Sequence, residues 1–253
     1  MAEQSEAPAG AIDRALAVLG VLAEASQPMG VTEIARRVGL PKSVVRYHVS
    51  ALVRNRYVEA RPDRRYGLGH AALRLGRGNH TNLELRTMAL PHMRALHHET
   101  WETVTLSALV GHERVYVDQL VSPQEIKLSV ELGRPFPLHA GASGRVILAF
   151  LPTDSREALL SEPLERLSPR TVVDPAGLRE MLESVRVTGV AISRSERHEG
   201  AAAVAAPVFD AHGVAGAMSV CGPEFRFDEA SLERYAPLLK TAALQLSREL
   251  GWR

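Results

Sequence analysis

Residues 31–58 read VTEIARRVGLPKSVVRYHVSALVRNRYV, and this stretch decides how the N-terminal part of the chain folds. Thr32 is expected to cap a short helix, on which Ile34 and Val38 recur at helical spacing. Gly39 suits a left-handed helix end, and Pro41 suits the first turn of the next helix. Two helices joined by a turn of about three or four residues that contains glycine are typical of a helix-turn-helix.

The second of these helices, predicted over Pro41–Asn55, has two distinct faces. The apolar face is expected to pack in a core and carries Val45, Val49 and Leu52. The other face is polar, and its members are Ser43, Arg46, Tyr47 and Ser50. Arginine can read guanine edges with paired hydrogen bonds, and serine and tyrosine can reach phosphates or bases. This face predicts DNA recognition, although a merely solvated helix face has the same pattern.

The sequence on both sides extends this unit. Upstream, Ala11–Ala25 is expected as an amphipathic helix whose core stripe is Ile12, Leu16, Leu19 and Leu22. Downstream, Tyr57–Ala60 and Tyr66–Leu68 are strand-like, and the turn Arg61–Arg65 between them holds three arginines. A basic hairpin directly after a recognition helix is placed to touch phosphates or the minor groove. Together these elements predict a winged helix-turn-helix.

The charge distribution agrees with this interpretation. The whole chain has 30 Lys+Arg and 29 Asp+Glu, a net charge of +1 that argues against nucleic acid when taken alone. Between Val31 and Tyr66, however, nine basic and three acidic residues give +6, and the other 21 basic and 26 acidic residues give −5. A basic segment joined to an acidic remainder is expected of a polyanion-binding module on a larger body.

Length and composition exclude several classes of protein. The chain has 253 residues, enough for two domains of roughly 100–200 residues. It contains no run near the ~18 apolar residues of a membrane-spanning helix, and Met1–Gly10 does not resemble a secretory signal. The single cysteine, Cys221, excludes an internal disulfide. We therefore expect a cytoplasmic protein with no membrane partner.

The remaining sequence predicts an α+β domain. A flexible break is expected at Gly76–Asn79 and a long helix over Asn82–Glu102. Further helices are expected over Ser143–Leu151, Thr153–Ser161 and Asp174–Thr188. Strands are expected over Val104–Leu106, Val115–Val117, Ile126–Val130, Val190–Arg194, Ala203–Phe209 and Val214–Val220.

Several of these stretches resemble the IclR-type transcriptional regulators. Ala15–Ala23 (ALAVLGVLA), Val31–Val45 (VTEIARRVGLPKSVV) and the YVE and RRYGLG stretches of Leu52–Leu68 are similar to that family's winged helix-turn-helix. In the C-terminal part, the similar segments are Pro137–Ala140 (PLHA) with Ser143–Arg145, Gly200 with Val204–Asp210 (VAAPVFD), and Gly216–Pro223 (GAMSVCGP). The resemblance spans residues 11–250 in the family's order.

This resemblance implies a domain plan and a set of partners. It implies a winged helix-turn-helix over 9–70, a linker and dimerisation segment over 71–102, and a GAF-like effector-binding domain over 103–253. The expected partners are a double-stranded DNA operator, a small organic effector and a second copy of the chain, as a homodimer or a dimer of dimers. No cofactor is expected. The DNA-contacting candidates are Thr32, Arg37, Lys42, Ser43, Val44, Arg46, Tyr47, Ser50, Arg54, Arg64 and Arg65.

The family pattern also implies the lining of an effector pocket: Leu128, Ala142, Ser143, Ser193, Ala203, Ser219 and Cys221. Backbone amides of Ala142 and Ser143 at a helix start could hold a carboxylate, so a carboxylate or aromatic acid is the expected effector. The chain departs from the family at five positions. His48 replaces an apolar residue, Val44 a common Thr, Arg145 a common Lys, Ala203 a frequent Cys, and Ser193 a frequent acid.

Two other interpretations stay open at this stage. A small-molecule-converting enzyme with a helical adaptor is the alternative function, because Gly141–Arg145 resembles a nucleophile elbow and Cys221 could pair with His139. The elbow requires glycine where Arg145 stands, and a lone cysteine in an apolar strand is more often a core residue, so no catalytic residue is expected. His92, His97 and His98 could suggest a metal site, but no carboxylate completes a convincing set.

Overall fold

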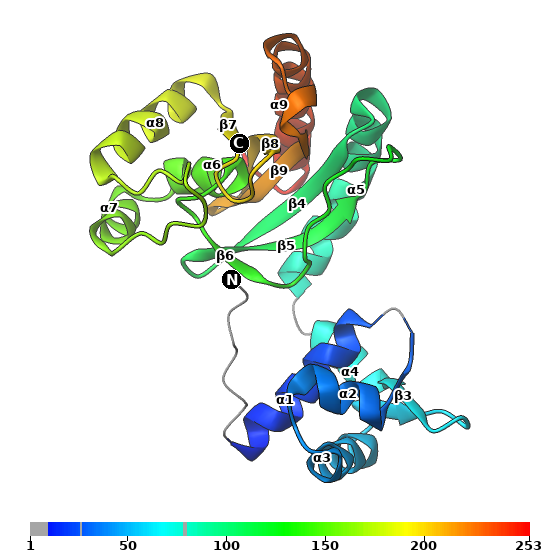
Figure 1. The fold of residues 1–253 in the computed structure, drawn as a ribbon. Coiled ribbons are helices and arrows are strands. Elements are labelled where there is room, and N and C mark those ends of the chain that lie inside the picture. The colour runs from blue at the N-terminus through cyan, green and yellow to red at the C-terminus, as the bar shows by residue number, and fades with distance from the viewer. Residues whose placement is uncertain (1–9, 26, 78–79) are drawn as a thin grey trace. The chain divides into compact units, whose positions relative to one another are not determined.

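Two units divide the chain, an N-terminal unit of Met1–His80 and a C-terminal unit of Thr81–Arg253 (Figure 1). The computed structural model describes residues 10–25, 27–77 and 80–253. None of the helices within these ranges is long and apolar enough to cross a membrane.

The N-terminal unit contains four helices and three short strands in its described part. In chain order they are α1 (Ala11–Glu24), β1 (Met29–Gly30), α2 (Val31–Val38), α3 (Lys42–Arg54), β2 (Val58–Ala60), β3 (Arg65–Leu68) and α4 (His70–Arg77). The strands form an antiparallel sheet in the order β1-β3-β2. The predicted helix-turn-helix and hairpin are therefore confirmed. Gly39 ends α2 at φ 68°, as its left-handed role requires.

The core of this unit differs from the predicted one on α1. Leu22 is buried and Leu19 packs against the core, as predicted, but Ile12 is 75 % and Leu16 59 % exposed, so the predicted apolar stripe is wrong for these two residues. Val18 and Leu22 lie one turn apart on the face that meets α2 and α3, and Leu19 packs partly buried beside them. On α3, the expected core residues Val45, Val49 and Leu52 are buried.

Three local predictions here need correction. Thr32 does not cap α2, because the N-cap is Gly30, two residues earlier, and Thr32 lies in the first turn of the helix. The stretch Gln27–Gly30 does more than end α1, since Met29 and Gly30 pair with Tyr66 and Arg65 of β3. The predicted break at Gly76–Asn79 is wrong in its first half, where α4 continues through Arg77, and its second half lies outside the described residues.

The C-terminal unit is built on one six-stranded antiparallel sheet with the order β6-β5-β4-β9-β8-β7. The strands are β4 (Thr103–Val110), β5 (Glu113–Leu120), β6 (Pro135–Pro137), β7 (Ala191–Arg194), β8 (Ala201–Asp210) and β9 (Gly213–Pro223). The helices are α5 (His80–Thr100), α6 (Ala142–Phe150), α7 (Thr153–Ser161), α8 (Pro175–Thr188), η1 (Glu224–Arg226) and α9 (Glu229–Glu249). The α+β class is confirmed. The helix α9 was not predicted.

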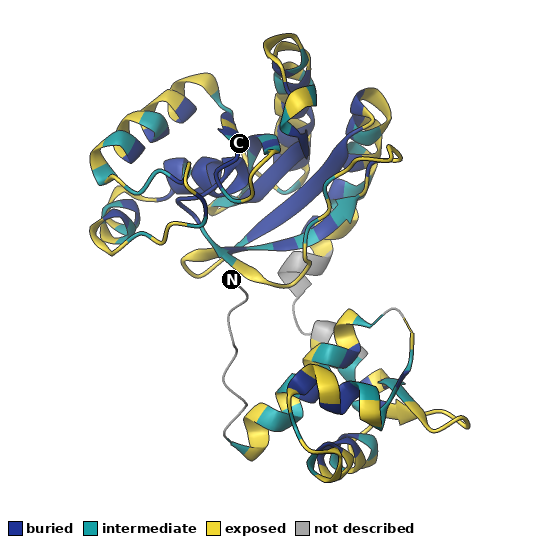
Figure 2. Cartoon of the chain, viewed as in Figure 1, coloured by how far each residue is buried: buried dark blue, intermediate teal, exposed yellow. Residues whose placement is uncertain are grey.

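Helices cover both faces of this sheet, and Figure 2 shows its central strands buried. Alternate residues of β8 face opposite sides, as in any strand. Ala202 and Val204 belong to the core shared with α5 and α9, whereas Ala205 belongs to the core shared with α6 and α8. Gly144 lets α6 approach closely, because a Cβ there would lie 2.5 Å from the carbonyl oxygen of Leu138.

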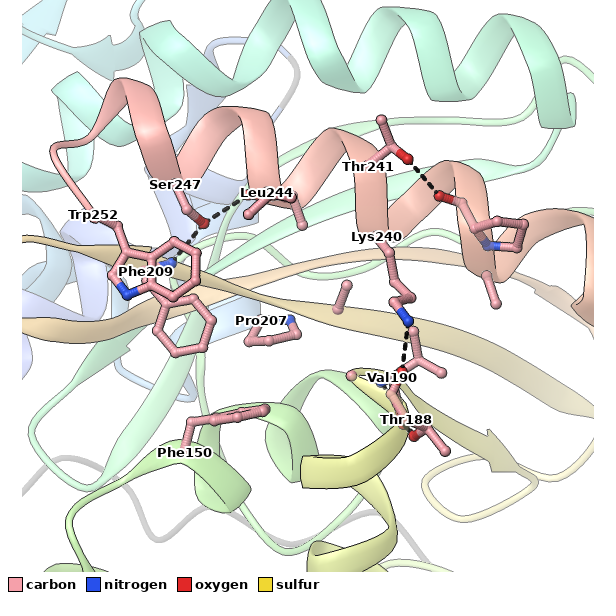
Figure 3. A pocket seen from close by; sticks show the side chains of 15 residues that line it. Phe150, Thr188, Val190, Pro207, Phe209, Lys240, Thr241, Leu244, Ser247 and Trp252 are labelled. Carbon is pink, nitrogen blue, oxygen red and sulfur yellow. Dashed lines mark hydrogen bonds between the residues drawn. The ribbon is translucent and has the colours of Figure 1, made fainter.

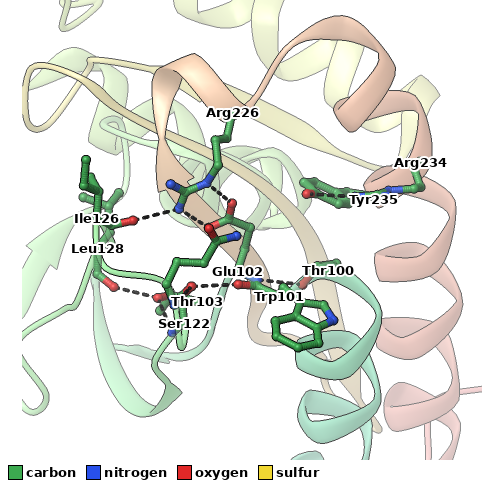
Figure 4. A network of polar contacts seen from close by, with 11 residues as sticks. Thr100, Trp101, Glu102, Thr103, Ser122, Ile126, Leu128, Arg226, Arg234 and Tyr235 are labelled. Carbon is green, nitrogen blue, oxygen red and sulfur yellow. Dashed lines mark hydrogen bonds and ion pairs between the residues drawn. The ribbon is translucent and has the colours of Figure 1, made fainter.

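The segment 121–134 is not the strand that the alternation of Ile126–Val130 predicted. Side chains hold two of its carbonyls (Figure 4): the Thr103 hydroxyl donates to the carbonyl of Leu128 at 2.6 Å, and Arg226 Nη2 donates to that of Ile126 at 2.9 Å. One backbone bond joins it to β5, from the amide of Gly133 to the carbonyl of Tyr116 at 2.9 Å. Arg226 is itself held by the buried Glu102, through Nη2 to Oε2 at 2.9 Å. The segment thus lies fixed beside the sheet without forming one of its strands.

Candidate functional site

The polar face of α3 is exposed, as a DNA-reading face must be. Lys42, Ser43, Arg46 and Arg54 are exposed, Tyr47 is 69 % exposed, and Val44 is half-buried. The Ser50 hydroxyl donates to the carbonyl of Arg46 at 2.8 Å. The departure His48 lies on the other face and is buried beside Val49, with its ring edge-on to Tyr47 at 5.3 Å.

The hairpin turn presents its three arginines to solvent. Arg64 has φ 61°, and its amide donates to the carbonyl of Arg61 at 3.1 Å, which closes the turn. The Asp63 carboxylate accepts from the amide of Arg65 at 3.2 Å. Residues 61–65 are all exposed. This tip carries three positive charges and one negative charge on a short, hydrogen-bonded loop.

Glu33 on α2 connects the helix-turn-helix to the hairpin. Its carboxylate lies 3.8 Å from Arg37 Nη2 and 3.8 Å from Arg65 Nη2. Two of the predicted DNA-contacting arginines are therefore oriented by one acid within the unit. Thr32, the first candidate on the same helix, is exposed.

A cavity of about 590 Å³ lies in the C-terminal unit, at the N-terminal end of α6. Six of the seven residues predicted to line an effector pocket line it: Leu128, Ala142, Ser143, Ser193, Ala203 and Cys221. Ser219 does not line it, because its hydroxyl is 2.6 Å from that of Thr105 and buried within the sheet. The fixed segment 121–134 supplies Leu128 and its neighbours as one wall.

The same cavity contains a polar group of residues that the sequence did not single out. Arg114 and Tyr116 come from β5, Phe136 from β6, and Glu196 and Arg197 from the loop after β7. Alternation along β5 was the available signal, since Arg114 and Tyr116 are two residues apart and share one face of the strand. The register breaks after Tyr116, and Asp118 pairs with Arg86 of α5 instead. That polar face would ordinarily be assigned to solvent, but here it faces the cavity.

A buried ion pair fixes the end of α6 beside the cavity. Arg145 Nη2 lies 2.8 Å from Glu196 Oε1, and both side chains are nearly inaccessible. Arg145 also donates to the carbonyl of Ile192. The second oxygen of Glu196 accepts from the amide of Gly141 at 3.2 Å. Arg145, which stands where the family commonly has Lys, thereby connects the start of α6 to the loop after β7.

Cys221 is poorly suited to nucleophilic chemistry. Burial and the nearby Glu102 raise the pKa of its thiol to about 12, so it is neutral at physiological pH. The imidazole of His139 is engaged elsewhere, with Nε2 2.8 Å from the carbonyl oxygen of Glu165.

A second cavity of about 690 Å³ lies between α9 and β8 and is lined mainly by apolar side chains (Figure 3). Trp252 stacks on Phe209 at 4.9 Å, and the one lysine that lines it, Lys240, donates to the carbonyl of Thr188 at 2.9 Å. None of the predicted effector residues lines this cavity. The cavity at the start of α6 is the one lined by the predicted effector residues and by Arg114, two of whose nitrogens have no hydrogen-bond partner.

The histidines considered for a metal site have other contacts. His92 Nε2 lies 3.1 Å from a carboxylate oxygen of Glu249, and His97 Nε2 lies 3.0 Å from the carbonyl oxygen of Val121. Across the described part of the chain, no group of three or more potential ligands could hold a metal ion.

Comparisons with known proteins agree with this architecture. The family described as "IclR helix-turn-helix domain" matches residues 11–62, and "Bacterial transcriptional regulator IclR C-terminal" matches residues 79–248. The HTH-type transcriptional regulator KipR of Bacillus subtilis is 34 % identical over 224 residues, which cover 88 % of this chain and 90 % of that protein.

Solved structures show the same fold. The crystal structure of Thermotoga maritima IclR has a TM-score of 0.81 and 29 % identity, covering 95 % of this chain and 98 % of that one. An IclR homologue from Microbacterium hydrocarbonoxydans, complexed with 4-hydroxybenzoate, has a TM-score of 0.77 and 28 % identity, covering 96 % and 99 %. The relatives are named as regulators, not enzymes. The chain is therefore a DNA-binding transcriptional regulator that belongs to the IclR family.

Proposed function

We propose that the chain binds a two-fold related DNA operator as a homodimer, or a dimer of dimers, and that a small organic effector changes its affinity for that operator. The recognition surface consists of the polar face of α3 and the tip of the β2–β3 hairpin. The effector site is the cavity at the start of α6. The protein acts on DNA in the cytoplasm.

One observation carries the DNA-binding proposal. The exposed basic face of α3 and the exposed three-arginine turn occur in the same small unit, where Glu33 links α2 to the hairpin. A recognition helix reads base edges, and a basic wing adds phosphate contacts that position it. Winged helices that bind palindromic sites do so as dimers, because the two half-sites are related by two-fold symmetry.

The effector proposal is supported by the cavity and by a relative. Ala142 and Ser143, the first residues of α6, line the cavity, and the first turn of a helix favours negative charge. The Microbacterium homologue of similar fold was solved with 4-hydroxybenzoate, which is a carboxylate. We infer that the effector of this chain is also an acid.

The test measures DNA affinity and effector affinity on the same full-length protein. DNA fragments selected from a random library are labelled, and their affinity is measured by fluorescence anisotropy with and without candidate acids. Because coupling between two ligands is reciprocal, an acid that weakens DNA binding by some factor must lose affinity by the same factor when DNA is bound. The proposal is contradicted if the protein selects no DNA sequence. It is also contradicted if every acid that binds the protein leaves its DNA affinity unchanged.

A further inference from the structure

Arg114 is a fully buried cation without an acidic partner. It is 0 % exposed, and within the part of the chain that the structure describes it forms no ion pair. Two of its guanidinium nitrogens, Nε and Nη1, have no hydrogen-bond partner. Burying an unpaired charge carries a large desolvation penalty, and native proteins seldom leave such a charge uncompensated.

Arg114 borders the cavity at the point where α6 begins. A Cβ placed on Gly141, the N-cap of α6, would lie 3.9 Å from Arg114 Nη2 and 3.0 Å from Cδ of Arg197. The two arginines therefore flank the same helix end. Burial and the nearby Arg197 lower the pKa of Arg114, which stays protonated because arginine starts so far above neutrality.

Arg197 is the second cation without an acidic partner at this place. Its Nη1 donates to the Tyr116 hydroxyl at 2.7 Å, and its guanidinium carbon lies 4.0 Å from the centroid of Phe136. No ion pair of Arg197 is found among the described residues. The guanidinium of Arg114 likewise lies 4.6 Å from the centroid of Tyr116. Guanidinium groups thus occupy ring faces on which an aromatic ligand could otherwise stack.

Three other charged groups of the cavity have ion-pair partners, and its two remaining acids are exposed. Arg134 pairs with Glu131 at 3.2 Å, and Glu196 pairs with the buried Arg145. Glu113 and Glu165 are exposed. Burial and the nearby arginines lower the pKa of His198, so it is neutral at physiological pH. Arg114 and Arg197 are therefore the two cations of the lining that have no acid within ion-pair distance in the described structure, and a ligand can supply that partner.

We propose that the effector is a small aliphatic dicarboxylate, with one carboxylate bound by Arg114 at the start of α6 and the other by Arg197. A guanidinium group presents parallel N–H donors that match a carboxylate, so two of them select two such groups. The unsatisfied Nε and Nη1 of Arg114 are the donors for the first carboxylate, and because both are enclosed, the side chains that cover them must shift when it binds. This assignment rests on the proposed function, because it names the ligand class of the same cavity.

Calorimetry on the full-length protein without DNA tests the ligand class. The probes are malonate, succinate and glutarate, each against the monocarboxylate of equal chain length, with 4-hydroxybenzoate and inorganic phosphate as further arms. We expect at least one dicarboxylate to bind about tenfold or more tightly than its monocarboxylate. If no dicarboxylate does, or if 4-hydroxybenzoate or phosphate binds more tightly, the assignment is overturned.

Variants separate ligand binding from a structural role. Arg114→Met and Arg197→Gln should each remove the preference for the dicarboxylate, whereas Lys240→Met in the other cavity should keep it. Arg114→Met should also raise the melting temperature of the ligand-free protein, because an apolar side chain replaces an uncompensated buried charge. A lower melting temperature together with an unchanged preference would contradict the proposal. If Arg114→Met does not fold, Arg197→Gln still tests the proposal, because Arg197 is only partly buried. An unchanged preference for the dicarboxylate in Arg197→Gln would then contradict it.

The two proposals fail separately. A protein that selects DNA sequences but binds no dicarboxylate overturns the ligand class alone. A protein that binds a dicarboxylate but selects no DNA overturns the proposed function and leaves the cavity as the binding site of some other dicarboxylate-dependent process.

Discussion

Arginines serve opposite purposes in the two units of this chain. In the N-terminal unit, Arg46, Arg64 and Arg65 are exposed to solvent, where salt screens them and a polyanion can reach them. In the C-terminal unit, Arg114 and Arg145 are 0 % and 1 % exposed. A buried guanidinium needs a partner at contact distance, and only Arg145 has one within the described structure, Glu196. Exposed arginines are thus available to any phosphate backbone, whereas a buried one specifies its partner.

The largest effect is expected where a buried partner is removed. Glu196→Gln leaves Arg145 as an unpaired charge among buried groups, so the C-terminal unit should lose about 3–5 kcal/mol of unfolding free energy. Urea unfolding of the full-length protein measures this loss. The matched control is Glu157→Gln, which breaks the exposed pair with Arg179 and should leave the transition where it is. Equal shifts for both variants would abolish the contrast between buried and exposed arginines.

The next effect concerns base recognition. Arg46→Ala should weaken binding to a selected operator by about 1–3 kcal/mol, if Arg46 reads a base edge. Fluorescence anisotropy at fixed salt measures it. Arg74→Ala is the control, because it also removes one positive charge from this unit, but from α4 rather than α3. An operator affinity that is unchanged in Arg46→Ala would remove this residue from the recognition surface.

The hairpin should contribute through salt rather than sequence. Replacing Arg64 and Arg65 by alanine should lower the slope of log affinity against log salt by about 2, if each arginine neutralises one phosphate. Titrations at several salt concentrations give the slope, on operator and on unrelated DNA. A slope equal to that of the parent chain would show that the hairpin does not touch the backbone.

The smallest effect is expected at Glu33. Glu33→Gln releases Arg37 and Arg65 and removes a negative charge, so affinity for unrelated DNA should rise about two- to fivefold at low salt. Glu59→Gln also removes one negative charge, from β2, but releases no arginine. The gain in DNA affinity of Glu33→Gln beyond that of Glu59→Gln therefore measures the effect of releasing Arg37 and Arg65. If both variants gain equally, the ion pairs of Glu33 have no influence on DNA binding.

The sequence predicted elements that rest on local chemistry. The turn at Gly39 and the helix predicted over Asp174–Thr188 have capping residues at their ends, and the structure confirms both, with Pro175 as the first helical residue. Predictions failed where packing between distant segments decides. Ile12 and Leu16 have helical spacing, but the helix packs through Val18 and Leu22 instead.

The residues of the cavity also differ in whether the sequence could predict them. Its residues near the start of α6 could be predicted, because they share motifs with a known family. Arg114 could not, since a cation on the polar face of a strand is ordinarily solvated, and only the assembled sheet shows that this face is enclosed. Ser219 fails for the converse reason: it belongs to a matching motif, yet Thr105 takes up its hydroxyl.

The segment 121–134 gives the cavity a wall that can evolve independently of the sheet. The Gln119 side chain imitates one step of a β-ladder, because it donates to the carbonyl of Val130 at 2.8 Å and accepts from its amide at 2.9 Å. One substitution at such a tie would reshape the wall while every ladder hydrogen bond of the six strands remained. A common scaffold can in this way acquire a new chemical signal through a few side chains, without repeating the search for a stable fold.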